Sequence, residues 1–335
     1  MKAYVAVKKS HPRFDSFFTE EIRRYIGGFA EIQWAAGENV TTESIVREID
    51  PDTDIYVTLW GSPRLDKEIL DAAPNIKLLV HLAGTVVPFV SDAMWDKGVR
   101  AISGNYHFAK SVAEGCIAYM LAAQRRIPDY SNNLKYRKIG KGLGTNAGIL
   151  DKTIGIVSLG AIANYLIEML QPFHPKLKVY SRRPISEKLV KLGCEQVSLE
   201  EIFSTCDIIS LQTSYNEHTH HMFNADLFKL IKPGALLLNT ARGKIIDEPA
   251  LIEELKDGRF TAFLDVYETE PPAQDNGLFD LPNVYMMPHR GGPTHDRCPF
   301  IVRDLFTDAY EYVSGKKTEL SYEISREKAA SMTDR

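Results

Sequence analysis

Short apolar runs alternate along the chain with longer stretches in which apolar residues recur at helical spacing. Residues 55–59 and 235–239 are typical of the short runs, because apolar side chains fill nearly every position. Runs of this kind indicate parallel strands that are buried on both faces, and the helical stretches between them indicate βαβ units. The pattern therefore predicts an α/β fold with parallel sheets.

Residues 1–103 predict a first domain in which five strands alternate with polar helical stretches. The expected strands are residues 3–7, 30–34, 55–59, 77–82 and 100–102. This is a small flavodoxin-like layout. From Ser111 an apolar helix follows, and the basic, glycine-rich stretch 125–148 then breaks the helical periodicity and predicts an irregular arm.

A second series of strands predicts a doubly wound parallel sheet of the Rossmann type, which binds nucleotides. It begins with residues 153–158. The further strands are expected at residues 178–180, 195–197, 207–211, 235–239, 261–266 and 284–287. A last helix, at about residues 296–314, follows after this sheet is complete.

The turn after residues 153–158 stands where a Rossmann fold has the pattern G-x-G-x-x-G, and here it reads S-x-G-x-x-A. Gly160 permits close approach of the pyrophosphate, and Ala163 permits tight packing of helix against strand. Ser158 replaces the first glycine, so the tight turn has to accommodate a Cβ atom. The amides of Ala161 and Ile162, at the start of the next helix, are expected to face the pyrophosphate.

The end of the following strand distinguishes between cofactors. An NAD site usually places Asp or Glu there to hold the ribose hydroxyls. This chain has Ser181, Arg182 and Arg183 instead. A serine and two guanidinium groups can bind a 2′-phosphate by charge-assisted hydrogen bonds, so we predict that NADP(H) is preferred and that NAD(H) is possible.

Arg242, Glu270 and His289 each follow a predicted strand. Open α/β sheets bind ligands outside the carboxyl ends of their strands, so these three side chains are expected to converge. The set suits reduction of a 2-oxo acid: Arg242 holds the carboxylate, His289 gives a proton to the carbonyl oxygen, and Glu270 keeps the imidazole charged and oriented. The alternative is a surface ion pair between Arg242 and Glu270 beside an unrelated loop histidine.

The surroundings of these residues, at 239–248, 264–271 and 288–292, resemble the D-isomer-specific 2-hydroxyacid dehydrogenases, in which Arg, Glu and His occur in this order. The likeness runs from about residue 77 to about residue 313. It implies an enzyme similar to glyoxylate and hydroxypyruvate reductases, which catalyses NAD(P)H-dependent, reversible reduction of a 2-oxo acid to a D-2-hydroxy acid.

The resemblance also implies further contacts. Ala83, Gly84 and Thr85 correspond to the family's loop that holds the substrate carboxylate opposite Arg242, although the family's acidic residue beyond this loop is absent here. Asp265 matches the residue that binds the cofactor carboxamide. The other cofactor contacts carried over by position are Gln212, Thr213, Thr240, Ala241 and Gly291.

The family layout implies that the last helix crosses back to the first domain. The expected substrate domain is therefore discontinuous, with residues 1–103 and 296–335, and the nucleotide-binding domain covers residues 104–295. The helix from Ser111 and the arm 125–148 correspond to the family's dimer-forming segment. A homodimer is therefore expected.

Composition limits the other possibilities. A chain of 335 residues accommodates two domains, and a net charge of −4 does not favour nucleic acid or an anionic membrane surface as a partner. The apolar runs are shorter than the roughly 18 residues of a membrane span. The four cysteines, Cys116, Cys194, Cys206 and Cys298, form no Cys-x-x-Cys pair. A cytoplasmic protein with reduced thiols is expected.

The segment His218-Thr219-His220-His221 is the histidine cluster that raises the question of a metal. Its spacing lacks the i, i+4 geometry of a helical zinc site, and no cysteine or second cluster accompanies it. A solvated loop is the favoured interpretation, so no metal is predicted.

Two rival functions fit the same motifs. Formate or phosphite oxidation would use the same three catalytic residues on this scaffold. A cofactor-sensing regulator or corepressor could also retain them, but the chain has no basic tail or DNA-binding appendage.

Overall fold

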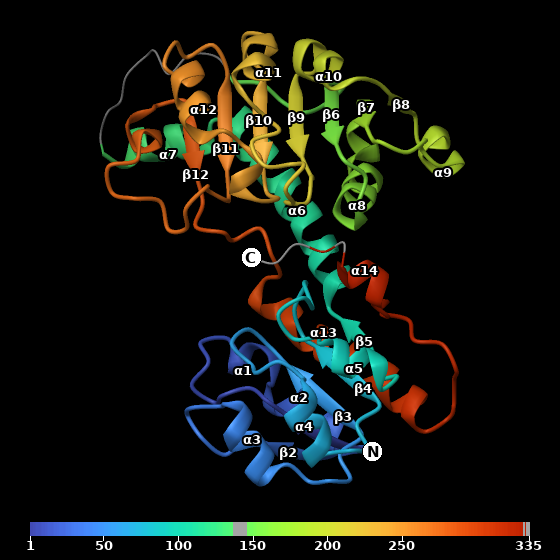
Figure 1. Cartoon of the computed structure of the whole chain (residues 1–335). Helices are drawn as coiled ribbons and strands as arrows, with labels where there is room; N and C mark the ends of the chain where they lie inside the picture. Colours follow the sequence, from blue (N-terminus) through green and yellow to red (C-terminus); the bar gives the residue numbers. More distant parts are fainter. Residues whose placement is uncertain (137–145, 331, 333–335) are drawn as a thin grey trace. The chain divides into compact units, whose positions relative to one another are not determined.

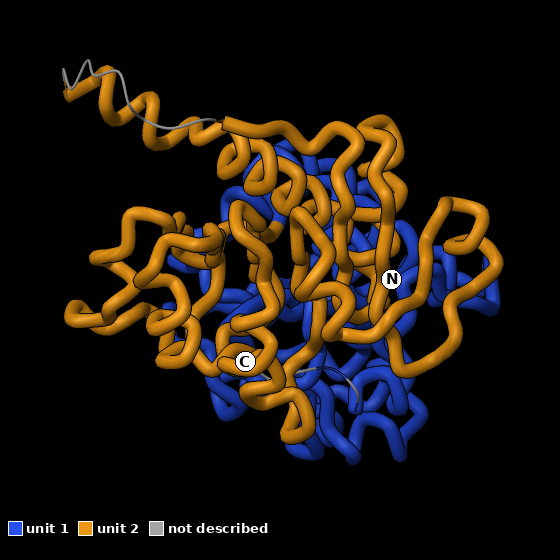
Figure 2. The backbone as a smooth tube through the Cα atoms, turned by 90° about the horizontal axis from the view of Figure 1, so that it is seen from above, with its two compact units in different colours: residues 1–108, 293–335 blue, residues 109–292 orange. Residues whose placement is uncertain are grey.

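The structure, a computed structural model of the chain, describes residues 1–136, 146–330 and 332. The chain divides into two compact units. Unit 1 comprises Met1–Phe108 and Pro293–Arg335, and unit 2 comprises Ala109–Gly292. Figure 2 shows unit 1 in blue and unit 2 in orange, so that the two separate stretches of unit 1 can be followed. The sequence analysis predicted the boundaries between the two domains after residues 103 and 295.

Unit 1 contains a five-stranded parallel sheet in the order β2-β1-β3-β4-β5 (Figure 1). This order confirms the predicted flavodoxin-like layout. The strands are β1 (Lys2–Val5), β2 (Glu31–Trp34), β3 (Ile55–Thr58), β4 (Leu78–His81) and β5 (Arg100–Ser103). The helices are α1 (Phe14–Phe17), α2 (Glu20–Gly27), α3 (Thr42–Glu48), α4 (Lys67–Ala72), α5 (Asp92–Asp96), η4 (His295–Arg297), α13 (Cys298–Val313) and α14 (Arg326–Ala330).

Helices cover both faces of this sheet. Successive residues of a strand point to opposite faces, so one strand contributes side chains to both cores. Ala3 and Val5 of β1 lie in one core with residues of α1, α2 and α13. Tyr4 lies in the other core, with residues of α3, α4 and α5. Every residue of β3 and β4 is buried. This two-sided burial explains why the strands are apolar at nearly every position.

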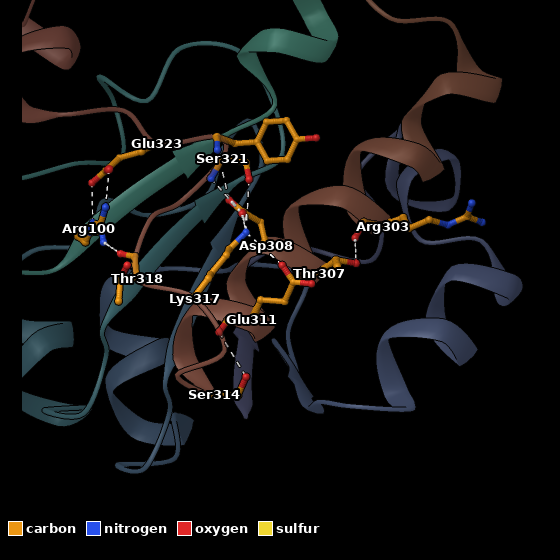
Figure 3. A network of polar contacts seen from close by, with 11 residues as sticks. Arg100, Arg303, Thr307, Asp308, Glu311, Ser314, Lys317, Thr318, Ser321 and Glu323 are labelled. Atoms are coloured by element: carbon orange, nitrogen blue, oxygen red, sulfur yellow. Dashed lines mark hydrogen bonds and ion pairs between the residues drawn. The ribbon is translucent and has the colours of Figure 1, made fainter.

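The C-terminal tail of unit 1 is fastened around Asp308 of α13, which is only 2% exposed (Figure 3). Its carboxylate pairs with Lys317 and accepts hydrogen bonds from two backbone amides of the tail. Farther along, Glu323 forms an ion pair with Arg100 of β5. The sequence analysis predicted no element beyond residue 314, so the short helix α14 was missed.

Unit 2 contains a seven-stranded parallel sheet in the order β12-β11-β10-β9-β6-β7-β8 (Figure 1). The strands are β6 (Thr153–Val157), β7 (Lys176–Tyr180), β8 (Cys194–Gln196), β9 (Ile208–Leu211), β10 (Leu236–Asn239), β11 (Thr261–Leu264) and β12 (Val284–Met286). The helices are α6 (Asn105–Gln124, which begins in unit 1), α7 (Ile127–Lys135), α8 (Ala161–Leu170), η1 (Gln171–Phe173), α9 (Glu187–Lys191), α10 (Leu199–Thr205), α11 (Ala225–Leu230), η2 (Gly243–Ile245), α12 (Glu248–Leu255) and η3 (Gly277–Asp280).

This second sheet is also covered on both faces. Met120 of α6 and Leu166 of α8 lie in the core on one side. Phe203 of α10, Phe228 of α11 and Leu251 of α12 lie in the core on the other side. The chain winds in opposite directions from β6 and from β9, which are neighbours in the sheet. The predicted doubly wound Rossmann sheet is therefore confirmed.

The stretch 125–148 was predicted to be irregular, and this is wrong for its first part, because α7 occupies Ile127–Lys135. Pro128 lies in the first turn of the helix, where a missing N–H costs no helical hydrogen bond. No residue of α7 is buried. The few apolar residues of the helix are exposed and lie in a basic, glycine-rich stretch, so their helical spacing was not recognised in the sequence. Residues 137–145 of this stretch lie outside the described residues.

Candidate active site

The predicted site residues of unit 2 follow the carboxyl ends of neighbouring strands. Taken in sheet order from β12 to β7, the strands are followed by His289, Glu270, Arg242, Thr213, Gly160 and Ser181. Parallel strands end at the same edge of a sheet, so these residues lie along one edge. The edge includes the point between β6 and β9 at which the strand order reverses, where open α/β sheets bind their ligands.

Glu270 and His289 form a hydrogen-bonded pair in which Nδ1 of His289 lies 2.7 Å from Oε2 of Glu270. The other oxygen of Glu270 accepts a hydrogen bond from the amide of Tyr267 at 3.2 Å. Burial acts to raise the pKa of Glu270, but the hydrogen bond and charge of His289, the Tyr267 amide and the charge of Arg242 together lower it. An ionised Glu270 thus holds the imidazole by Nδ1.

Asp265 supports the turn that carries His289. Its side chain, in a residue only 1% exposed, accepts hydrogen bonds of 2.7 Å from the amides of Arg290 and Gly291. Its carbonyl oxygen accepts one from the amide of His289 at 2.9 Å. Burial raises the pKa of Asp265, and the two amides oppose this rise. Tyr119 of α6 also donates to Asp265, at 3.3 Å, and this contact was missed in the sequence.

Asn239, the buried last residue of β10, shapes the loop that carries Arg242. Its Nδ2 donates to the carbonyl oxygen of Arg242 at 2.9 Å, and its Oδ1 accepts from the amide two residues farther on at 3.0 Å. The sequence analysis missed Asn239, although a polar residue at the end of an otherwise leucine-rich strand was an available signal.

Gly243 brings the Arg242 loop against the loop after β11. A Cβ atom at this position would lie 1.8 Å from the backbone carbonyl carbon of Tyr267, so no larger residue fits without movement of the backbone. The two loops therefore touch backbone to backbone. This contact explains why the charge of Arg242 acts on the pKa of Glu270, three residues beyond Tyr267.

The turn after β6 retains a glycine-like conformation without its first glycine. Ser158 has a φ of 75°, and its Oγ lies 2.9 Å from Oγ1 of Thr213. Gly160 is the N-cap residue of α8, and no side chain caps this helix. The space around the Cβ position of Gly160 is open to 4 Å. Uncapped amides beside open space at a helix start fit a pyrophosphate group.

The side chains of Gln212 and Thr240, two predicted cofactor contacts, bond to each other inside unit 2. Nε2 of Gln212 donates to Oγ1 of Thr240 at 3.2 Å and to Oγ of Ser210 at 3.0 Å. Thr240 also lies 3.2 Å from Sγ of Cys116. Burial raises the pKa of Cys116 to about 11, so this thiol stays protonated. The cluster joins α6 to the ends of β9 and β10.

The loop after β7 exposes the side chains of Arg182 and Arg183. Gln196 of β8 fixes its backbone, with Nε2 donating to the carbonyl oxygens of Ser181 at 2.8 Å and of Arg183 at 3.0 Å. Ser181 Oγ accepts from the amide of Arg183 at 3.2 Å. Within the part of the chain that the structure describes, no carboxylate pairs with either guanidinium group.

Ala83, Gly84 and Thr85 belong to unit 1, where they follow the carboxyl end of β4. A Cβ atom on Gly84 would lie 3.8 Å from the ring of Phe108. The ring of Phe108 packs against Trp60 with 5.9 Å between the ring centroids. Trp60 follows β3, the neighbour of β4, and the sequence analysis did not single it out.

The described residues also bear on the questions of metal ligands, disulfides and membrane-spanning helices. In residues 1–136, 146–330 and 332, no three His, Cys, Asp or Glu side chains gather as a metal site. The four cysteines are buried and unpaired. None of the described helices combines the length and apolar character needed to span a membrane.

Known proteins match this arrangement in sequence and in fold. The model of the D-isomer specific 2-hydroxyacid dehydrogenase NAD binding domain matches residues 117–291. The chain is 31% identical over 281 residues to the glyoxylate reductase of Thermococcus litoralis, which covers 82% of this chain and 84% of that protein. It is 31% identical over 263 residues to the hydroxypyruvate reductase of Thermotoga maritima, with 76% and 84% covered.

Among solved structures, D-lactate dehydrogenase from Lactobacillus jensenii matches with a TM-score of 0.78 over 97% of this chain and 100% of that chain. Its identity is 21%, so this match shows a shared fold. The family model covers the strand ends at which Arg242, Glu270 and His289 stand. The chain belongs to the D-isomer specific 2-hydroxyacid dehydrogenase family, whose members are oxidoreductases that interconvert 2-oxo acids and D-2-hydroxy acids with a nicotinamide cofactor.

Proposed function

We propose that Arg242, Glu270 and His289 are the catalytic residues of a reductase that converts a small 2-oxo acid to the D-2-hydroxy acid. The observation that carries this proposal is the 2.7 Å contact between His289 and Glu270. Arg242 stands at the neighbouring strand end, near enough to lower the pKa of Glu270. A proton donor, its orienting carboxylate and a fixed cation are what reduction of a carbonyl beside a carboxylate requires.

His289 supplies the proton of the reaction. Reduction adds a hydride to C2 and a proton to the carbonyl oxygen, and a nicotinamide cofactor, when bound, would supply the hydride. Nδ1 of His289 is held by Glu270, so Nε2 gives the proton. In the reverse direction a neutral His289 takes the proton from the hydroxyl group. A positioned acid of this kind contributes roughly 10²–10⁴-fold to a rate.

Arg242 binds the substrate carboxylate. Its planar guanidinium group can donate two parallel hydrogen bonds, which a lysine ammonium group cannot reproduce. Asn239 and Gly243 hold the backbone on either side of it. The amides of residues 83–85 in unit 1 are proposed as further ligands of this carboxylate.

NADP(H) is the proposed cofactor, with NAD(H) as a possible substitute. The exposed Arg182 and Arg183, with Ser181, present cations and a hydroxyl group to a 2′-phosphate. Ser181 stands where an NAD site has a carboxylate, which would repel that phosphate. The start of α8 would hold the pyrophosphate. The remaining proposed contacts are Gln212, Thr213, Thr240, Ala241, Asp265 and Gly291.

A homodimer built on α6 and α7 is the proposed assembly. Ile127 and Leu134 on α7 are 55% and 69% exposed. They are seven residues apart, with Tyr130 between them on the same helix face. Exposure of these apolar side chains to water is unfavourable, and a second copy of the chain would cover them. A cytoplasmic location is also proposed for the protein.

The deciding experiment measures NADPH and NADH oxidation at 340 nm with a panel of 2-oxo acids. We expect turnover with higher kcat/KM for NADPH, and a loss of roughly 10²-fold or more in His289→Asn. Asparagine tolerates the left-handed backbone of His289, whose φ is 54°. His174→Asn is the matched control, because His174 is also exposed, with a φ of 51°.

The outcomes separate the parts of the proposal. Equal efficiency with both cofactors would refute the NADP(H) preference alone. Turnover that survives in His289→Asn would refute the role of His289. Tight NADPH binding without turnover of any acid would favour the regulator, and turnover of formate or phosphite would favour the other rival function.

A further inference from the structure

The histidine segment 218–221 lies against both catalytic loops of unit 2. The amide of His221 donates to the carbonyl oxygen of Lys244 at 3.0 Å. Nε2 of the same histidine lies 2.9 Å from Oε1 of Glu268. Lys244 is two residues beyond Arg242, and Glu268 is two residues before Glu270. One residue thus contacts both of the loops that carry the proposed substrate cation and the partner of the proposed acid.

The two loops differ in their other supports. The Arg242 loop is fixed from within by Asn239, and the chain after His221 pairs with it again, since the amide of Phe223 donates to the carbonyl oxygen of Ile245 at 3.0 Å. The Glu270 loop is held by contacts with other segments, since the hydroxyl group of Tyr267 donates to the carbonyl oxygen of Met287 at 2.9 Å and Glu270 contacts His289. The amide of Glu268 donates to Oε2 of Glu248 at 3.0 Å, and its side chain meets His221.

One carboxylate and several rings surround the imidazole of His221. Glu268 is the carboxylate paired with it. The ring of His220 stacks on His221 with 3.9 Å between the centroids, and the ammonium group of Lys244 lies over the ring of Tyr215. Both members of the His221–Glu268 pair are about one-third exposed, so water still reaches the contact.

We propose that His221 is a positioning residue for this reaction, which holds the Glu268–Glu270 turn in register with the Arg242 loop through its Nε2 contact with Glu268. The inference rests on the proposed roles of Arg242, Glu270 and His289. His221 touches neither substrate nor cofactor in this scheme. It acts through the turn that aims Glu270 at His289, and therefore on proton delivery.

The backbone of His221 suggests a sharp pair of substitutions. Its φ is 49°, a region that asparagine tolerates better than most residues do. His221→Asn therefore preserves the turn but is too short to reach Glu268. His221→Gln places an amide nitrogen close to the position of Nε2 and restores the hydrogen bond. The matched control is His218→Asn, because His218 is exposed and its ring has no hydrogen bond within the described residues.

Steady-state kinetics of 2-oxo acid reduction give the first test. In His221→Asn we expect kcat to fall about three- to tenfold, the effect of one net hydrogen bond, while KM changes less than twofold because Asn239 still holds the Arg242 loop. His221→Gln and His218→Asn should stay within about twofold of the wild type. Adding Glu268→Gln to His221→Asn should cause little further loss, because both changes remove the same contact.

Hydrogen exchange gives a second test that does not depend on turnover. Amides of residues 266–270 should exchange faster in His221→Asn than in the wild type, and at wild-type rates in His221→Gln and His218→Asn. Unchanged exchange and unchanged kcat in His221→Asn would overturn the inference. Equal losses of kcat in the Asn and Gln variants would also overturn the inference. The loss would then follow from removal of the imidazole ring and not from loss of the hydrogen bond to Glu268. A wild type without turnover would refute the proposed function, and exchange alone would then decide whether His221 holds the turn.

Discussion

At the scale of single residues, the loops at the strand ends of unit 2 hold three non-glycine residues in the left-handed region. Ser158, His221 and His289 have φ values of 75°, 49° and 54°. This conformation costs roughly 1–2 kcal/mol for an L-residue. Each side chain makes one specific contact, with Thr213, Glu268 and Glu270 respectively. The same conformation also occurs outside the site, for example at His174, but three such residues along one sheet edge are typical of functional loops.

The lowered pKa of Glu270 leads to a prediction about pH. A carboxyl group with a lowered pKa stays ionised throughout pH 5–8, so the charge of Glu270 does not change there. Reduction takes up a proton and should speed up as the pH falls, whereas oxidation gives up a proton and should slow down. Values of kcat measured in both directions from pH 5 to pH 8 check this. Parallel trends in the two directions would exclude His289 as the proton carrier.

At the scale of elements, the site depends on contact between the loops that follow β10 and β11. Gly243 permits this contact, because a Cβ atom there would lie 1.8 Å from the carbonyl carbon of Tyr267. Arg242 and Glu270 stand on the two loops that Gly243 joins. The glycine is therefore expected to matter both for folding and for catalysis.

Gly243→Ala should lower the free energy of unfolding by about 3 kcal/mol or more, because backbone atoms and not a flexible side chain must move. It should also reduce kcat/KM, since Arg242 and Glu270 move with their loops. Urea unfolding and steady-state kinetics measure the two effects. Gly27→Ala is the control. Gly27 is the last residue of α2, and no atom lies within 4 Å of its Cβ position, so this substitution should be neutral or slightly stabilising. A Gly243→Ala protein with wild-type stability would contradict the loop contact.

At the scale of the whole molecule, the proposed dimer assigns a role to the exposed apolar residues of α7, because they would form the contact between the two copies. Light scattering after size exclusion should give twice the chain mass at micromolar concentration. Ile127→Glu with Leu134→Glu should shift the protein towards the monomer, because two carboxylates would have to be buried without partners. Val190→Glu is the control, since Val190 on α9 is also an exposed apolar residue, at 57%. A monomeric mass of the wild-type protein in light scattering would refute the proposed dimer.

The sequence by itself determined the two parallel sheets and the residues that stand at their strand ends. Buried parallel strands are apolar throughout, so β10 was expected at 235–239 and is found at Leu236–Asn239. The turn containing Gly160 and the motifs around Arg242, Glu270 and His289 are local in the sequence, and local patterns can be read without a structure. The helix α7 was missed, because none of its side chains is buried and its exposed apolar residues lie in a basic, glycine-rich stretch.

Only the tertiary structure decided which of these residues touch. His221 and Glu268 are 47 residues apart, and Tyr119 and Asp265 are 146 residues apart. Neither pair leaves a periodic or compositional trace, because each contact involves one side chain at each end and arises only when distant segments of the chain come together. The histidine segment therefore looked like a solvated loop in the sequence. The folded chain brings one of its imidazoles to the carboxylate two residues before Glu270.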